Sequence, residues 1–402
     1  LKNKIDLKQI LKPKKSQVQQ LLDKTIIIGG GVGGLFLAAL LNSTNITILE
    51  KNSSLGKKLL ASGGGKCNIT NENISFKKDL LKYYLGDKNF INQIISNLNY
   101  LEVLEFFKPL KFEKVKNSQF FCKNGSKSVL NHLKSKITNP KIYLNTEVFD
   151  VVKNDDIFKI YTNNGNFECK NLIVASGGLS CQNLGVSDIG YKIASKFNHE
   201  ISTLNPALVG FSVQKDEFWF KNISGVCFSA KAKILQNNKV LSGDLLFTHR
   251  GISGPLMMNA SLFWQKGKIS INFLPNFDFD KFKNSKKQIT SILPLPKSFI
   301  KEFLKISNLE DKQFFKLLDL EFQTLKKLQN YEFSPAGNFG YSKAEITKGG
   351  IKTDFIDENC QSKLVKNLYF IGEVLDVGGM IGGFNIHFAF ACAKAASKAL
   401  TQ

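Results

Sequence analysis

The chain has 402 residues, of which 43% are hydrophobic and 22% charged, so it is long enough for two or three globular domains. Its seven scattered cysteines lack a Cys-x-x-Cys pair. This argues against a metal site, a disulfide scaffold or a dithiol centre and favours the cytoplasm. The formal charge of +22 leaves two interpretations open, a basic surface for an anionic partner such as RNA or a compositional bias towards lysine, because Arg250 is the only arginine.

The first elements predict a βαβ unit. Residues 1–24 are rich in Lys and Gln without the apolar segment of a signal peptide, so we interpret them as an N-terminal extension. Residues 25–29 predict a buried parallel strand, residues 33–42 a helix of small residues, and residues 46–50 the next strand. The apolar run over 25–41 is short for a bilayer span and glycines interrupt it, so no membrane helix is expected.

The later patterns predict an α/β domain with an insertion. Short alternating strand patterns cover residues 205–275, and an amphipathic helical part follows over about 278–330. A buried strand from residue 367 and an Ala-rich helix then resume the α/β pattern of the N-terminal part. Before the insertion we expect helices over 88–107, 128–137 and 186–198 and strands over 141–148, 157–162 and 171–175.

These patterns set the expected domain boundaries. The main, cofactor-binding domain is predicted over residues 25–190 and 345–402. The insertion over 191–344 is expected to serve the substrate.

The glycine-rich segment Gly29–Gly34 carries the strongest local signal. Gly29, Gly31 and Gly34 have the G-x-G-x-x-G spacing, which permits a tight turn, the approach of a pyrophosphate and close packing of helix on strand. The segment follows a strand and opens a helix, and Glu50 ends the next strand at the distance expected for a carboxylate that binds a ribose. A glycine-rich turn without a ligand is the less favoured alternative.

Three later segments favour FAD over NAD. Residues 175–178, Ala-Ser-Gly-Gly, end a strand at a point where the chain would pass the cofactor a second time. Glu373 after Gly372 could accept a hydrogen bond from a hydroxyl of the ribityl chain of FAD, although it could instead cap a helix. Residues 378–385 open a helix whose positive N-terminus would favour the anionic reduced flavin ring. No second G-x-G-x-x-G occurs, so NAD(P)H would have to use the flavin face that the substrate later uses.

Two further blocks are unusual for a Rossmann protein. Residues 57–68 read Lys-Lys-Leu-Leu-Ala-Ser-Gly-Gly-Gly-Lys-Cys-Asn, and residues 246–255 read Leu-Phe-Thr-His-Arg-Gly-Ile-Ser-Gly-Pro. With the glycine segments, they resemble the BaiN/RdsA (YhiN-like) family of NAD(P)/FAD-dependent oxidoreductases from about residue 25 to the C-terminus. The resemblance implies a Rossmann-like FAD-binding domain of the glutathione-reductase type, interrupted by an insertion with a β-barrel-like part and a helical part. Two departures are Lys66, where the family usually has Arg, and His387, where Gln is common.

The resemblance also implies a set of cofactor contacts. Ser62–Gly65 would lie against the isoalloxazine ring, where side chains would block access, with Cys67 and Asn68 close by. A redox role for Cys67 is weighed against simple packing. The residues expected at the cofactor are Gly29, Gly31, Val32, Gly33, Gly34, Glu50, Lys51, Lys57, Lys58, Leu59, Ser62, Gly63, Gly64, Gly65, Lys66, Cys67, Asn68, Val148, Ala175, Ser176, Gly177, Gly178, Gly372, Glu373, Asp376, Gly382, Gly383, Phe384, Asn385 and Ile386.

The insertion contributes two candidate catalytic residues, with Cys67 as the third candidate. His249 could donate a proton and Arg250 could clamp an anion from the substrate side. The equal alternative is a surface turn held by Gly251, Gly254 and Pro255.

The sequence thus predicts a cytoplasmic flavoenzyme that passes hydride from NAD(P)H through FAD to an unsaturated substrate. A uridine of ribosomal RNA, giving dihydrouridine, is the first choice among substrates of the resembled family, and the basic charge supports it weakly. A small-molecule reductase or amine oxidase, acting on a bile-acid-like or aminoacetone-like compound, is the alternative. A flavin-containing binding protein without turnover is a third.

Overall fold

The computed structural model describes residues 24–43, 45–75, 79–138 and 140–401, so the expected extension lies outside the described residues except for Lys24. The chain divides into two compact units. The first comprises the described residues of Leu1–Leu179, Asn183–Leu204 and Gly349–Gln402, and the second comprises Ser180–Gln182 and Asn205–Lys348.

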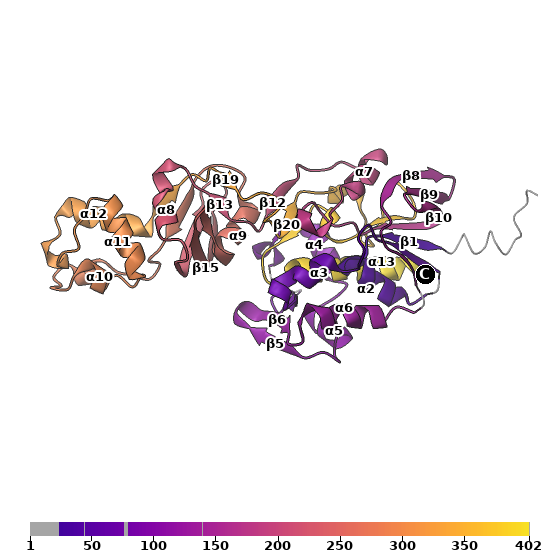
Figure 1. Cartoon of the computed structure of the whole chain (residues 1–402), viewed down its shortest axis with the longest axis horizontal. Coiled ribbons are helices and arrows are strands. Elements are labelled where there is room, and N and C mark those ends of the chain that lie inside the picture. The colour runs from indigo at the N-terminus through magenta and orange to yellow at the C-terminus, as the bar shows by residue number, and fades with distance from the viewer. Residues whose placement is uncertain (1–23, 44, 76–78, 139, 402) are drawn as a thin grey trace, which may run out of the picture. The chain divides into compact units, whose positions relative to one another are not determined.

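A five-stranded parallel sheet forms the centre of the first unit (Figure 1). Its inner strands are continuous runs of buried β-branched and aliphatic residues, as expected for a sheet that is covered on both faces. The strand order is β21 (Leu368–Phe370), β11 (Asn171–Val174), β1 (Thr25–Ile28), β2 (Ile46–Leu49) and β7 (Lys141–Tyr143). The predicted Rossmann-type α/β fold is confirmed.

Two helices rich in small residues pack against each other in the first unit. They are α2 (Val32–Leu41) and α13 (Phe384–Leu400), and the ring centroids of Phe36 and Phe390 lie 4.5 Å apart between them. The other helices of this unit are α3 (Lys57–Ala61), α4 (Lys88–Ile95), α5 (Tyr100–Phe106), α6 (Gly125–Ser135) and α7 (Ile189–Lys196).

The helix expected over 88–107 is wrong as a single element, because the chain forms α4 and α5 with a break between them. Asn99 caps α5 in a capping box: its side chain accepts from the Glu102 amide at 3.0 Å, and the Glu102 carboxylate accepts from the Asn99 amide at 2.7 Å.

Three smaller sheets complete the first unit. One contains β8 (Val148–Asn154), β9 (Ile157–Thr162) and β10 (Gly165–Cys169). Another contains β3 (Asn68–Asn71), β6 (Gln119–Cys122) and β5 (Phe112–Val115), and the third pairs β4 (Tyr84–Leu85) with β22 (Gly378–Gly379).

The second unit is built on a seven-stranded antiparallel sheet. The helical part expected over 278–330 consists of three short helices joined by turns, and Pro294 and Pro296 separate the first helix from the second. The sheet order is β18 (Tyr331–Phe333), β17 (Ile269–Asn272), β14 (Cys227–Ile234), β15 (Lys239–Thr248), β16 (Gly251–Ser253), β13 (Phe211–Ser212) and β19 (Gly337–Asn338). Strands β12 (Asn205–Ala207) and β20 (Ile346–Lys348) pair separately, and the helices are α8 (Trp219–Asn222), α9 (Gly254–Phe263), α10 (Ile289–Ile292), α11 (Lys297–Ile306) and α12 (Asp319–Lys326).

The unit boundaries fall at 204/205 and 348/349, whereas the sequence patterns placed them at 190/191 and 344/345. Helix α7 and the segment after it belong to the first unit because their side chains bind there. Lys196 forms an ion pair of 2.6 Å with Asp150 of β8, and the His199 Nε2 atom lies 2.8 Å from the Ser362 hydroxyl. Within the described residues, no helix has the length and apolar character needed to cross a membrane.

Candidate functional site

The turn between β1 and α2 leaves space at one glycine and none at two others. A Cβ atom at Gly29 would lie 2.4 Å from the Ala175 carbonyl oxygen, and one at Gly34 would lie 2.2 Å from the Gly29 oxygen. At Gly31 a Cβ atom would meet nothing within 4 Å, and no side chain caps the helix that begins there. The outer glycines are therefore required by the protein's own backbone, and the middle one lies beside open space at a helix N-terminus. Val32 and Gly33 form the first turn of α2.

Glu50 is held at the end of β2 beside this turn. Its carboxylate accepts hydrogen bonds from the Gly30 amide at 2.8 Å and from the Asn52 amide at 2.7 Å, and the residue is only 8% exposed. These two bonds fix the carboxylate next to the glycine turn. A carboxylate in this position can accept hydrogen bonds from ribose hydroxyls.

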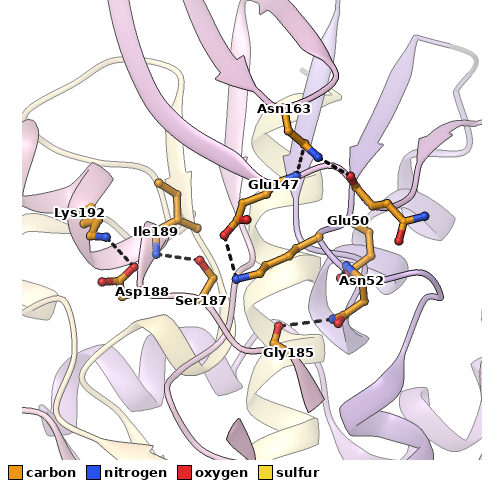
Figure 2. A network of polar contacts seen from close by, with 11 residues as sticks. Glu50, Asn52, Glu147, Asn163, Gly185, Ser187, Asp188, Ile189 and Lys192 are labelled. Carbon is orange, nitrogen blue, oxygen red and sulfur yellow. Dashed lines mark hydrogen bonds and ion pairs between the residues drawn. The ribbon is translucent and has the colours of Figure 1, made fainter. Parts of the chain in front are cut away.

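A polar network continues outward from Glu50 (Figure 2). Lys51 forms an ion pair of 2.8 Å with Glu147, and the Asn52 side chain donates to the Gly185 carbonyl at 3.5 Å. Buried Val148 follows Glu147 and begins β8. The network thus joins the end of β2 to β8 and to the segment after β11, which carries Ala175, Ser176, Gly177 and Gly178.

The triple glycine takes a left-handed backbone. Gly63, Gly64 and Gly65 have φ values of +57°, +63° and +87°, which glycine adopts without strain. A Cβ atom would meet nothing within 4 Å at Gly64 or Gly65; at Gly63 it would lie 3.0 Å from the Phe121 ring and 3.6 Å from the Asn68 backbone nitrogen. The conformation therefore accounts for the three glycines, and the loop presents bare backbone to open space.

Two of the predicted segments meet through an ion pair. The Lys58 Nζ atom lies 2.6 Å from the Glu373 carboxylate, although 315 residues separate them. Lys57 donates to the Asn52 side chain at 3.1 Å, which connects α3 to the network around Glu50. The Ser62 hydroxyl donates to the Leu59 carbonyl at 2.6 Å, and Leu59 itself is buried.

The start of α13 packs against β3. A Cβ atom at Gly383 would lie 2.6 Å from the Asn68 Oδ1 atom, and the Asn71 side chain donates to the Gly382 carbonyl at 2.9 Å. The Asn385 side chain accepts from the Gly379 amide at 2.7 Å and donates to the Gly379 carbonyl at 2.8 Å. These contacts hold the glycine turn before α13 in place, with Phe384 stacked on Tyr83 and Ile386 half-buried in the first turn.

Asn68 supplies an acceptor that the described residues do not use. Its side-chain nitrogen donates to Gln119 at 2.8 Å, but its buried Oδ1 atom has no hydrogen-bond partner in the described part of the chain. A buried acceptor without a donor is costly, and an N–H or O–H group of a ligand would satisfy it. The open helix N-terminus, the fixed Glu50 carboxylate and this acceptor fit a dinucleotide that carries a ring with N–H donors, as FAD does.

Cys67 does not have the environment of a redox nucleophile. The residue is fully buried, and burial raises the pKa of its thiol to about 12, so the thiolate form is suppressed. Its carbonyl accepts from the Cys122 amide at 3.2 Å, across the β3–β6 pair. The geometry favours the packing interpretation and argues against the catalytic one. Lys66, which precedes Cys67, is exposed.

His249 and Arg250 lie in the second unit, on the exposed turn between β15 and β16. The Arg250 guanidinium lies 4.7 Å from the centroid of the Phe339 ring, and its amide donates to the Thr248 hydroxyl at 3.3 Å. Their contacts within that unit are those of a surface turn. The glycine segments belong to the first unit.

Burial shifts the pKa values of two polar side chains at the site. His387, fully buried, places Nε2 2.9 Å from the Leu98 carbonyl and Nδ1 2.8 Å from the Thr70 hydroxyl, and burial lowers its pKa to about 4. Its tautomer therefore carries the proton on Nε2, and its role is to join α13 to β3. Burial also raises the pKa of Asp376.

The predicted cofactor contacts did not include Asn71, Gln119 and Phe121, which surround Asn68 and the glycine turns. For Gln119 and Phe121 no local signal exists, because β6 reaches β3 only through sheet pairing. Asn71 lies three residues after Asn68, and its contact with the Gly382 carbonyl follows only from the fold.

Comparison with known proteins gives consistent matches along the chain. A family model described as the HI0933-like protein Rossmann domain matches residues 23–399. A Haemophilus influenzae protein named ribosomal RNA dihydrouridine synthase is 32% identical over 400 residues, which cover 94% of this chain and 98% of that protein. An Escherichia coli protein of the same name is 29% identical over 392 residues, covering 93% of this chain and 97% of its own.

A third relative carries a different name. A Clostridium scindens protein named 3-dehydro-bile acid delta(4,6)-reductase is 29% identical over 410 residues, which cover 94% of this chain and 98% of that protein. The family resemblance that the sequence blocks predicted is confirmed.

Proposed function

The chain belongs to the HI0933-like family of Rossmann-domain proteins and is an FAD-dependent oxidoreductase, and from this premise we propose that it reduces a uridine of ribosomal RNA to dihydrouridine. The reductant would be NAD(P)H. One uridine, one NAD(P)H and one proton would give one dihydrouridine and one NAD(P)⁺, so the electrons and protons balance.

The similarity to two relatives with that name carries the proposal. It extends over more than nine-tenths of this chain and of both relatives, so it includes the second unit as well as the cofactor-binding one. The bile-acid reductase supports the same chemistry on a different molecule, because its name also denotes reduction of a conjugated double bond. A small-molecule substrate is therefore the second candidate.

FAD, when bound, would carry the hydride from NAD(P)H to the electron-poor double bond of the substrate. The chain's own residues would hold and orient the cofactor. The amides at Gly31 and Val32 would bind the pyrophosphate, the Glu50 carboxylate the adenosine ribose, and the Asn68 Oδ1 atom an N–H group of the ring.

His249 and Arg250 of the second unit are exposed, and we propose that His249 can donate a proton and that Arg250 can bind a phosphate of the substrate. Neither role requires Cys67, whose thiol is buried.

The proposal is tested with the purified protein loaded with FAD. It is incubated with NADH or NADPH and an unmodified ribosomal RNA transcript, and dihydrouridine is mapped by mass spectrometry of nuclease fragments. We expect one modified position with the full protein and none without reductant. An unmodified transcript, together with reduction of a bile-acid enone under the same conditions, would replace the RNA proposal with the small-molecule one.

A further inference from the structure

The β5–β6 hairpin of the first unit (Figure 1) and the segments that flank it are rich in lysine. Residues 108–127 contain six lysines and a single acidic residue, Glu113. Two of these lysines are neutralised locally: Lys108 by Glu105 at 2.9 Å and Lys114 by Glu72 at 2.6 Å. Of the four other lysines, Lys116 lies between β5 and β6, and the remaining three lie at the base of the hairpin and at the start of α6.

Three exposed lysines form this remaining cluster, which we call the hairpin-base lysines: Lys111, Lys123 and Lys127. None of them has an ion pair or a side-chain hydrogen bond to another residue that the structure describes. Lys111 and Lys123 are neighbours across the hairpin, since the Lys123 amide donates to the Lys111 carbonyl at 2.9 Å. Like charges in neighbouring cross-strand positions repel each other unless an anion lies between them.

Lys127 adds to this arrangement from the first turn of α6. A cation is unfavourable at the positive end of a helix dipole, and the N-cap residue Asn124 makes no side-chain hydrogen bond to the helix amides. Lys111 and Lys123 are thus neighbours across the hairpin, Lys127 follows four residues later at an uncapped helix end, and none of the three has a counterion among the described residues. An anionic partner would stabilise all of them together.

The hairpin-base lysines are tied to the proposed flavin loop. A Cβ atom at Gly125 would lie 3.2 Å from the Gly65 carbonyl oxygen, and the Ser126 hydroxyl donates to the Leu60 carbonyl at 2.8 Å. The Cys122 amide donates to the Cys67 carbonyl at 3.2 Å. Lys123 and Lys127 are therefore within two residues of groups that contact the loop, in the same unit.

We infer that the hairpin-base lysines bind backbone phosphates of the RNA substrate and hold the strand that carries the target uridine next to the triple-glycine loop. This inference rests on the proposed function and gives it a docking surface. A polyanion with regularly spaced phosphates can contact Lys111, Lys123 and Lys127 at once, whereas a small neutral substrate has no use for them. Lys66 is left out of the test below because it belongs to the expected cofactor set.

The test compares two triple variants of the full, FAD-loaded protein. In one, Lys111, Lys123 and Lys127 are all changed to Gln; in the matched control, Lys134, Lys136 and Lys141 are changed to Gln. The control lysines are also exposed and lie at and beyond the other end of α6. The dissociation constant of a fluorescein-labelled RNA stem-loop with loop uridines is measured by anisotropy over a series of KCl concentrations, and flavin content by absorbance.

We expect the hairpin variant to bind the RNA at least ~10-fold more weakly, with the slope of log K against log salt reduced by about 2, and with unchanged flavin content. The control variant should stay within about 2-fold of the wild type. Equal binding by both variants and the wild type would overturn the docking surface while leaving the RNA substrate in place. A wild type that does not bind RNA would overturn both proposals, and lysine-dependent binding to phosphatidylglycerol vesicles in its place would identify a membrane as the partner.

Discussion

In the first unit, glycine segments leave backbone next to open space, whereas in the second unit a cluster of aromatic rings fills the interior. Phe247, Phe273 and Phe299 are buried there with ring centroids 5.0 to 6.3 Å apart. The first arrangement leaves bare backbone and open space where a ligand can lie, as at Gly31 and Gly64. The second excludes ligands and holds an exposed turn in place. A substitution by Ala should therefore destabilise the two units for different reasons: overlap with backbone atoms at a glycine of the first unit, and a cavity at a buried ring of the second.

The largest effect is expected from Gly34→Ala. The added Cβ atom would lie 2.2 Å from a backbone oxygen that no side-chain rotation can move, so we expect a loss of more than about 4 kcal/mol in the free energy of unfolding. FAD binding should be lost with it. Thermal melting and flavin absorbance of the purified variant measure both effects.

Gly31→Ala is the matched control for this prediction. Its Cβ atom meets no protein atom within 4 Å and its φ of −82° suits any residue, so the melting temperature of the FAD-free protein should be that of the FAD-free wild type. The methyl group would occupy the space of the pyrophosphate, so FAD affinity should fall ~10-fold or more. A Gly34→Ala protein that is as stable and as yellow as the wild type would contradict our account of this turn.

Phe247→Ala should have the next largest effect, confined to the second unit. Removing a fully buried ring costs about 3–4 kcal/mol of stability because of lost burial and a residual cavity. Flavin content should be unchanged, since the glycine segments belong to the other unit. Denaturant unfolding measures the first quantity and absorbance the second.

Phe315→Ala serves as the control, because this ring in the same unit is 46% exposed and its loss should change stability by less than about 0.5 kcal/mol. Loss of flavin from Phe247→Ala at a temperature where the protein stays folded would show that the two units do not respond separately.

The contrast between the units also explains what could be predicted from the sequence. The β1–α2 turn and Glu50 were predictable because the fingerprint is local and each glycine has a separate physical reason. The break before α5 was readable in principle, since Asn99 and Glu102 form a capping box four residues long. Pro294 and Pro296 likewise limit helix length in the second unit, but the amphipathic pattern runs across both prolines and did not by itself indicate this limit.

Other features could not be read because they depend on distant pairings. Gln119 reaches Asn68 across 51 residues, and Thr70 reaches His387 across 317. The triple glycine was noticed in the sequence, but the left-handed backbone that Gly63, Gly64 and Gly65 adopt could not be read there.

Stability should depend on pH through His387. Burial lowers its folded-state pKa to about 4 from the ordinary value of 6.5, so between these pH values the unfolded chain binds a proton that the folded protein does not. The folded state is therefore favoured above pH 6.5 and loses about 3 kcal/mol as the pH falls towards 4.

The measurement is urea unfolding of the wild type and of His387→Gln at pH 7.5 and pH 4.5. Other acid-sensitive groups, such as the Asp150–Lys196 ion pair, are present in both proteins, so the difference between their pH responses isolates His387. The glutamine variant should lose less stability on acidification. Identical pH responses would mean that His387 does not stay neutral in the folded state.

The smallest effect is expected from Cys67→Ala. The residue is fully buried, so truncation removes one sulfur atom and should cost about 1 kcal/mol of stability. The rate of substrate reduction should stay within about 2-fold of the wild type, because burial raises the pKa of this thiol to about 12 and leaves no thiolate for redox chemistry. Steady-state rates at saturating NAD(P)H check this, with Cys122→Ala as the neighbouring control on the paired strand. A rate that falls 100-fold for Cys67→Ala alone would restore the catalytic interpretation of this residue, and would mean that the thiol becomes accessible during turnover.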